Sequence, residues 1–257
     1  MFTVAEMTAF VGSFWWPFIR VAALFSVLPV LGGTQIPMRI RVVAAFVISL
    51  AMAPLVGDVP AVEPLSAAGL LVTVTQILIG VVMGFIVLLV FNALLLGAEA
   101  IAITMGLGFA LMSDPQNGVQ IPVVGQFYQI LATLLFLALN GHHAMLQVMA
   151  DSFVFLPLNQ TFDPGLLWEL LRFASILFAG ALKIALPAII TLLTVNLVMG
   201  VMTRASPQLN VFSVGFPVTM TIGFLAIAAA LPVFGPNFEQ MLADAVALAR
   251  MLFAGGP

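Results

Sequence analysis

The chain has 257 residues, of which 63% are hydrophobic and only 7% are charged, and its formal net charge is −3. Soluble domains carry about 25% charged residues, so lipid or other apolar protein must cover much of this chain's surface. The scattered basic residues argue against nucleic acid as a partner, and the absence of cysteine excludes disulfides and cysteine-bound metals.

Runs without Asp, Glu, Lys or Arg divide the chain into six hydrophobic segments. Their apolar residues are continuous and do not alternate with polar ones, which favours helices over the strands of a barrel. We therefore predict an all-α membrane-associated protein with segments at 14–31, 41–57, 68–98, 121–140, 173–203 and 211–232. Prolines should bend or break several of these helices, at Pro17, Pro29, Pro54, Pro122, Pro187 and Pro217.

The first segment follows an acidic residue, Glu6, and no basic residue precedes Arg20. This pattern is unlike a cleavable signal peptide, so we expect the first segment to remain as an anchor. Alternating spans place Arg39, Arg41 and Arg204 on one side of the membrane. The positive-inside rule then predicts that the N-terminus lies outside the cytoplasm.

A few charges lie within or beside the apolar segments, where a charge is expensive: Arg20, Glu99, Lys183 and Arg204. One interpretation is a path for ions or protons. The other is structural pairing or contact with a neighbouring subunit. The absence of a chain of acids and histidines favours the second interpretation.

The segment 68–98 would form a helix of about 47 Å, longer than a bilayer core of about 30 Å. It must therefore tilt, kink or leave the membrane. Within it, Gly80 and Gly84 have the spacing that lets another helix approach closely. Chance in a glycine-rich chain explains the spacing equally well.

Residues 99–129 contain four glycines and two prolines between apolar side chains, so they cannot form one regular helix. They are also too apolar for an ordinary solvated loop. Irregular backbone at membrane depth is tolerated where protein buries it or where it lines a pore. A pore constriction and a packed apolar loop both fit the residues.

The connections between segments also carry signals. Asp114-Pro115, Asp163-Pro164 and Ser206-Pro207 are typical of a helix start, with a capping residue followed by proline. Residues 143–153 place polar side chains four residues apart and predict an amphipathic helix on an interface.

No arrangement of side chains in the sequence supports catalysis or a cofactor. The acids are dispersed, and no phosphate-binding glycine motif follows a strand. His142 and His143 are adjacent, which suits one metal ion badly, so we interpret them as an interfacial pair at a segment end. We expect no enzyme, no metal and no cofactor.

Several motifs together resemble the FliR family of flagellar type III export-gate proteins. The most specific motif is GLGFALMSDPQNG, from Gly106 to Gly118. It is followed by Pro122 and by Gly125-Gln126-Phe127-Tyr128. Others are Trp16–Arg20, Ile36–Arg41, Phe136–His143 and Asn196–Asn210. The resemblance covers nearly the whole chain in order, and injectisome relatives share parts of the pattern.

The resemblance implies a fold of helical hairpins with kinked and broken helices, like a fusion of a FliP-like part (1–172, with a plug loop near 105–120) and a FliQ-like part (173–257). It implies assembly with FliP and FliQ homologues, with an FlhB homologue bound outside, at the flagellum basal body in the bacterial inner membrane. Unfolded flagellar proteins would pass through the channel. The implied plug comprises Gly106, Leu107, Gly108, Phe109, Ala110, Leu111, Met112, Ser113 and Asp114. The alternatives are the equivalent injectisome subunit and a small-molecule permease.

Overall fold

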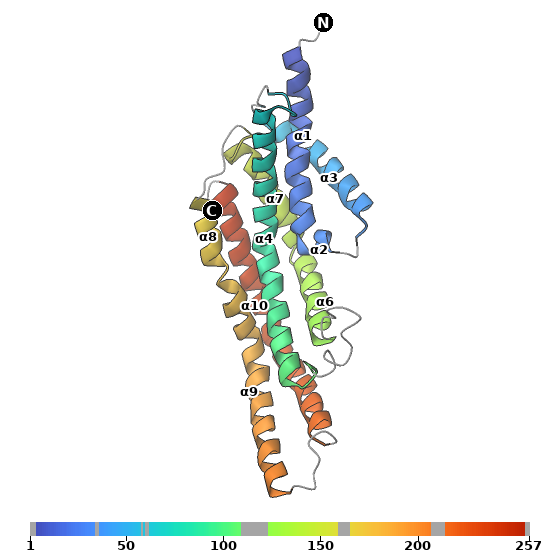
Figure 1. Cartoon of the computed structure of the whole chain (residues 1–257), viewed down its shortest axis with the longest axis vertical. Coiled ribbons are helices and arrows are strands. Elements are labelled where there is room, and N and C mark those ends of the chain that lie inside the picture. Colours follow the sequence, from blue (N-terminus) through green and yellow to red (C-terminus); the bar gives the residue numbers. More distant parts are fainter. Residues whose placement is uncertain are drawn as a thin grey trace. The chain divides into compact units, whose positions relative to one another are not determined.

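The computed structural model describes residues 4–33, 36–57, 59, 62–108, 123–158, 165–206 and 214–254. All regular structure in these ranges is helical, which confirms the all-α prediction (Figure 1). The chain forms two compact units. One comprises Met1–Leu89, Phe136–Ala174 and Leu242–Pro257, and the other comprises Val90–Leu135 and Ser175–Met241. The predicted boundary at 172/173 separates a FliP-like part of the chain from a FliQ-like part. It concerns likeness to two other protein families and stays a prediction.

The first unit is built from short and long helices around the N-terminal half of α4. Its elements are α1 (Val4–Val27), α2 (Pro29–Gly32), α3 (Met38–Met52), the 3₁₀ turn η1 (Ala53–Leu55), α7 (Gly141–Phe155) and α8 (Gly165–Phe173), with parts of α4 (Ala67–Thr104) and α10 (Phe216–Phe253). In the second unit, the rest of α4 and α10 pack with most of α6 (Val123–Ala138) and with α9 (Ile176–Ala205).

Helix α4 is one unbroken helix of 38 residues, or about 57 Å at 1.5 Å per residue. It contains no proline, so its backbone hydrogen bonds continue through the whole predicted segment and six residues beyond it. In its most apolar stretch, 67% of the residues are buried within the chain. Residues of this largely buried helix belong to both units.

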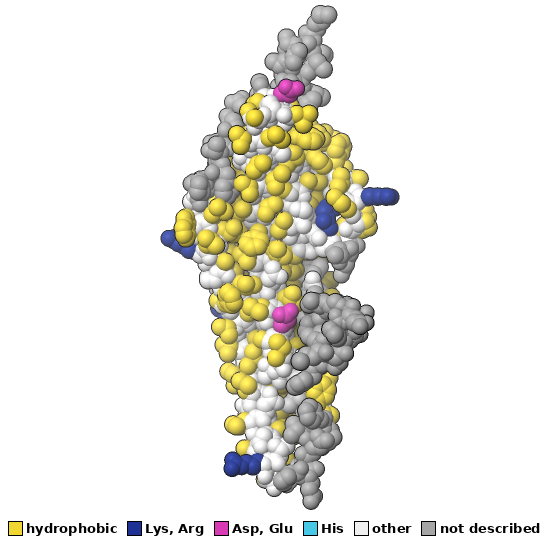
Figure 2. Space-filling view, viewed as in Figure 1, with side chains coloured by type: hydrophobic (Ala, Val, Ile, Leu, Met, Phe, Trp, Pro, Cys, Tyr) yellow, Lys and Arg dark blue, Asp and Glu magenta, His cyan; other side chains and the backbone are white. Residues whose placement is uncertain are grey.

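Four described helical stretches are long and apolar enough to cross a membrane: Met38–Leu55, Ala67–Thr104, Gly165–Ala205 and Phe216–Phe253. The bent pair α6 and α7 would make a fifth if it is one broken span. Unlike α4, the stretches at α3 and α10 are only 17% and 22% buried. Figure 2 shows the resulting surface, where hydrophobic side chains cover wide areas and charges are few. Lipid or partner proteins must cover these side chains.

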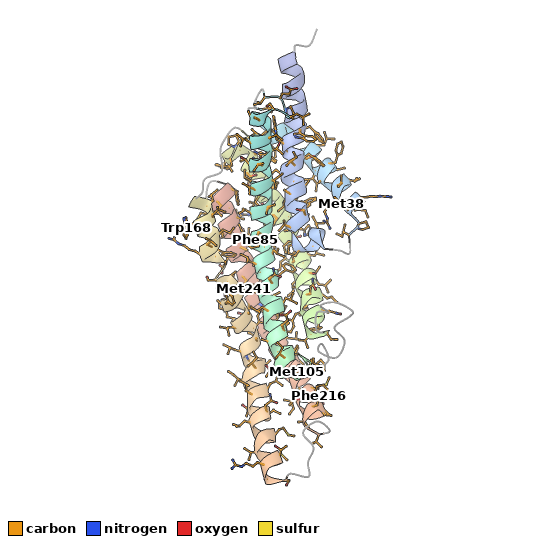
Figure 3. All side chains as sticks on the ribbon, viewed as in Figure 1. Met38, Phe85, Met105, Trp168, Phe216 and Met241 are labelled. Atoms are coloured by element: carbon orange, nitrogen blue, oxygen red, sulfur yellow. The ribbon has the colours of Figure 1, made fainter. Side chains whose placement is uncertain are left out.

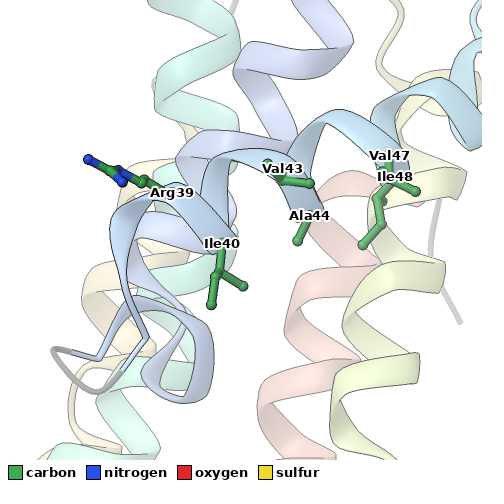
Figure 4. A pocket seen from close by; sticks show the side chains of 6 residues that line it. All are labelled: Arg39, Ile40, Val43, Ala44, Val47 and Ile48. Atoms are coloured by element: carbon green, nitrogen blue, oxygen red, sulfur yellow. The ribbon is translucent and has the colours of Figure 1, made fainter.

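Helix α3 illustrates this exposure. Along α3 runs an open apolar groove with Arg39 at one end, lined further by Ile40, Val43, Ala44, Val47 and Ile48 (Figure 4). Arg41, near the same end, turns back and donates a hydrogen bond of 3.0 Å to the backbone oxygen of Gly33.

The end of the last helix differs from the prediction. The apolar run was expected to end at 232, but α10 continues to Phe253 and contains Pro232 and Pro236. The acidic and basic side chains beyond 232 ended the hydrophobic pattern, but they do not end the helix. A proline removes one backbone hydrogen bond, and a packed neighbour makes this loss tolerable.

The predicted effects of proline hold at some positions only. Pro29 follows the break at Leu28 and begins α2, and Pro54 lies in the 3₁₀ turn after α3. Pro17 and Pro187 lie inside helices that continue past them, so neither proline breaks its helix. The predicted amphipathic helix at 143–153 is confirmed within α7, where His143 and Gln147 are exposed and Met145, Met149 and Phe153 are buried.

Candidate functional site

The C-terminal end of α4 is the best-defined structure beside the predicted plug. Gly106 has φ +86°, a left-handed conformation that side chains other than glycine rarely adopt. Its amide donates to the oxygen of Ile103 (2.9 Å), and the amide of Leu107 donates to the oxygen of Ala102 (3.0 Å). These two bonds form a Schellman motif, the usual way in which glycine ends a helix. Gly106 and Leu107 are thus joined rigidly to α4.

Side chains from two other helices cap the remaining carbonyls of α4. The Nδ2 atom of Asn196 in α9 donates to the oxygen of Thr104 at 3.3 Å. The hydroxyl of Thr219 in α10 lies 3.3 Å from the oxygen of Met105 and 3.0 Å from that of Phe216 in its own helix. The last carbonyls of a helix have no partner within the helix, so external caps of this kind complete it.

Apolar contacts lock the same helix end. Met105 is fully buried, and its side chain packs against Gly223 in α10. A Cβ atom added to Gly223 would lie 2.6 Å from the Cγ atom of Met105. Phe216 packs against Gly106 at the start of α10. Figure 3 labels Met105 and Phe216 at this end of α4. A cavity of about 360 Å³ adjoins the contact and is lined by Gly106, Asn196 and Phe216 among others.

The predicted plug is described only at its beginning. Gly106, Leu107 and Gly108 lie directly after α4, whereas Phe109, Ala110, Leu111, Met112, Ser113 and Asp114 lie outside the described residues. The predicted helix starts at Pro115 and Pro207 also lie outside them. Helix α8 begins at Gly165, immediately after the predicted start at Asp163-Pro164.

A second polar centre lies in the first unit, around Arg20. The side chain of Arg20 is fully buried. Its Nε donates to Oε1 of Gln76 (2.6 Å), Nη1 to the backbone oxygen and Oγ of Ser152 (3.0 Å each), and Nη2 to the backbone oxygen of Leu156 (3.0 Å). The guanidinium also lies 4.5 Å from the centre of the Phe153 ring.

These partners explain how a charge is tolerated there. Ser152 and Leu156 supply carbonyls from the C-terminal end of α7, where helix dipoles concentrate partial negative charge. The planar fork of arginine reaches acceptors on α4 and α7 at once. Arg20 therefore acts as a cap that ties α1 to both helices.

The other charges singled out in the sequence have different surroundings. Glu99 is half-buried, and Lys183 and Arg204 are exposed within this chain. Lys183 borders a small cavity that Tyr128 and Asn237 also line. Among the described residues, the one salt bridge joins Arg172 to Glu169, so Lys183 and Glu99 have no ion-pair partner in that part of the chain.

The glycine pair of α4 lies against α1. A Cβ at Gly80 would come 2.3 Å from the backbone oxygen of Arg20, and one at Gly84 would come 2.9 Å from the Cβ of Val27. Two helix backbones therefore meet at a distance that only glycine allows. Of the two explanations left open by the sequence, close helix packing accounts for this geometry.

The histidine pair lies at the start of α7. The rings of His142 and His143 are 4.1 Å apart, and Nδ1 of His143 lies 3.3 Å from Oδ1 of Asn140, which has φ 55°. No group of three His, Asp or Glu residues that could hold a metal occurs among the described residues.

Sequence reasoning missed the partners at both centres. Gln76, Asn196 and Thr219 lie in apolar runs that also contain other polar residues, such as Thr75, Thr194 and Thr221, so no local signal marked them out. Their partners are backbone carbonyls from distant segments, which no local pattern shows.

Comparison with known proteins gives a consistent result. A family model described as "Bacterial export proteins, family 1" matches residues 11–245. The chain is 38% identical over 241 residues to the flagellar biosynthetic protein FliR of Pectobacterium carotovorum, covering 93% of this chain and 92% of that protein. It is 35% identical to FliR of Escherichia coli K12 (94% and 93% covered) and 28% identical to FliR of Bacillus subtilis (92% and 93% covered).

Proposed function

The chain belongs to the FliR family of bacterial export proteins, and on that premise we propose that it forms part of the gate through which flagellar proteins leave the cytoplasm. It is an inner-membrane component of the flagellar export apparatus, a transport protein and not an enzyme. The relatives reported above are all flagellar, which favours this function over the injectisome equivalent. A small-molecule permease has no support in the comparisons.

The proposed partners are homologues of FliP and FliQ in one hetero-oligomer, with an FlhB homologue outside it. The exposed face of α9 supports assembly with other helices. Its apolar side chains recur three or four residues apart along one side of the helix, at Phe178, Leu182, Leu186, Ile190, Leu193, Leu197 and Val201. A stripe of this length, beside the exposed Lys183, suits a protein partner better than lipid alone, because a charge at membrane depth needs a polar contact.

We further propose that residues 106–114 constrict the channel. The observation that carries this proposal is the end of α4. A long, largely buried helix ends in a complete cap, and the sequence that follows the cap is apolar and contains Gly, Met and Leu. A gate must exclude water and ions yet yield to an unfolded chain. Apolar side chains at a constriction do the first, and glycines with adaptable methionine side chains favour the second.

Purification in mild detergent tests the assembly. We expect the chain made alone to be unstable or aggregated, because its exposed apolar surface has no cover. Co-expression with the FliP-like and FliQ-like proteins of the same bacterium should yield one stable complex that contains all three. A monodisperse, protease-resistant isolated chain that transports on its own would contradict the proposal.

A further inference from the structure

An apolar groove and an apolar cavity of the first unit adjoin at α3. The groove along α3 has a volume of about 510 Å³, and the cavity of about 170 Å³ is lined by α1, α2, α3, α7 and the end of α6. Ala44 and Ile48 line both, so the groove leads to the cavity. Together with Ile40, these residues are spaced four apart and lie on one side of α3 (Figure 4).

The lining of both spaces suits a hydrocarbon chain. Apart from Arg39, the groove is lined by Ala, Val and Ile alone, and His142 is the one polar side chain among the described residues that line the cavity. A buried water needs two to four polar partners, whereas an apolar cavity of about 150 Å³ stays dry and takes an apolar molecule.

The length of the groove matches one leaflet of a bilayer. From Arg39 to Ile48, α3 rises about 14 Å at 1.5 Å per residue. A bilayer core of about 30 Å gives each leaflet about 15 Å of hydrocarbon. Helix α3 belongs to a stretch that is long and apolar enough to cross a membrane, and only 17% of this stretch is buried within the chain. One acyl chain of a neighbouring lipid can therefore run along the groove.

Two arginines at the same end of α3 carry charges that the chain leaves unbalanced. Arg39 and Arg41 lie in the first turn of the helix, where the described residues supply neither an acidic side chain nor a side-chain cap. Among the described residues neither arginine has a carboxylate partner, and the buried Nε atom of Arg41 has no hydrogen-bond acceptor. The helix N-terminus adds its own partial positive charge. These groups together attract an anion, such as the phosphate of a lipid headgroup.

We propose that α3 binds one anionic phospholipid, whose phosphate contacts Arg39 and Arg41 and whose acyl chain lies along the groove and enters the cavity. The cations select a negative headgroup, and the apolar lining holds the chain. A protein segment fits less well, because its backbone would bring polar groups into a groove that offers them no hydrogen-bond partners. The lipid site does not depend on the proposed channel.

The test uses the complex co-purified with the FliP-like and FliQ-like proteins. Phosphatidylglycerol or phosphatidylcholine with the same acyl chains is added, and native mass spectrometry counts the bound lipid. A photoreactive group on the acyl chain identifies the residues that the chain touches. We expect phosphatidylglycerol to bind more tightly than phosphatidylcholine and to crosslink to Ala44, Ile48 and Met145. Inorganic phosphate should not displace it, because phosphate alone cannot use the groove.

Two variants separate the headgroup from the chain. Arg39→Gln removes one charge at an exposed position and should weaken phosphatidylglycerol binding about fivefold, as expected for about 1 kcal/mol per cation near a lipid headgroup. Ala44→Leu narrows the passage to the cavity and should reduce crosslinking to Met145 without changing the yield of the complex. Arg204→Gln and Ala51→Leu are matched controls at exposed positions that line neither space, and should change neither result.

Three outcomes would overturn the proposal. Equal binding of the two lipids, or normal phosphatidylglycerol binding to Arg39→Gln, would show that lipid merely surrounds the helix. Displacement of the lipid by inorganic phosphate would show that the groove contributes nothing. A photoreactive side chain at position 44 that captures a partner protein in place of lipid would assign the groove to a protein interface.

Discussion

The Nη2 atom of Arg20 lies 3.0 Å from the backbone oxygen of Leu156, the residue that follows the last turn of α7. The two residues are 136 positions apart in the sequence. Through this contact and those to Ser152 and Gln76, one buried cation connects α1, α4 and α7 without any carboxylate. The charge is therefore balanced by a helix end and not by an ion pair.

Replacing Arg20 should destabilise the first unit. Arg20→Met removes the donor to the oxygens of Leu156 and Gln76 and one of two donors to the backbone oxygen of Ser152, and we expect a loss of about 3 kcal/mol or more. Arg20→Lys should recover only part of it, because one ammonium cannot reach acceptors on two helices. Thermal unfolding of the purified complex, followed by size-exclusion chromatography, measures both. Arg39→Met, at an exposed position on α3, is the control, and an equal loss there would contradict this role for Arg20.

Adding a methyl group at Gly80 should separate α4 from α1. The obstacle is the backbone oxygen of Arg20, which cannot rotate away as a side chain can. We expect Gly80→Ala to cost about 1–3 kcal/mol in the same unfolding assay. Gly200→Ala is matched, because Gly200 lies in α9 with no atom within 4 Å of an added Cβ, and it should be neutral or stabilising. A neutral Gly80→Ala would show that the two backbones can move apart freely.

Lys183 is exposed within this chain, so its partner must come from another subunit if the charge is structural. Lys183→Ala should then lower the yield of the assembled complex but not the amount of chain inserted in the membrane. Lys183→Arg keeps the charge and should assemble. Affinity purification from membranes measures this. Normal assembly of Lys183→Ala, together with export that no longer depends on the proton-motive force, would assign the charge to transport instead.

The predictable part of this fold is the part that local chemistry determines. Continuous apolar runs located α6 and α9 to within three residues and α3 and α4 to within six, because a helix in lipid must satisfy its backbone internally. The extension of α10 to Phe253 was missed because Glu239 and Asp244 interrupt the hydrophobic pattern without interrupting the helix.

The site was only partly predictable for a different reason. The spacing of Gly80 and Gly84 indicated close packing but not the partner helix. Arg20 was identified as a costly charge, but the carbonyls that stabilise it come from the end of α7. Asn196 and Thr219 cap α4 from 92 and 114 residues away. Contacts of that kind follow from the tertiary fold and leave no periodic signal.

The conductance of the reconstituted complex tests the central claim most directly. Residues 107–112 are replaced with Gly and Ser, which removes the apolar side chains of the proposed plug and keeps the capped end of α4 at Gly106. Because apolar side chains close a constriction by excluding water, the altered complex should assemble normally and conduct ions well above the wild-type level. Cells that overproduce it should leak small solutes and grow poorly. A complex that assembles normally and conducts no more than the wild type would show that these residues do not close the channel.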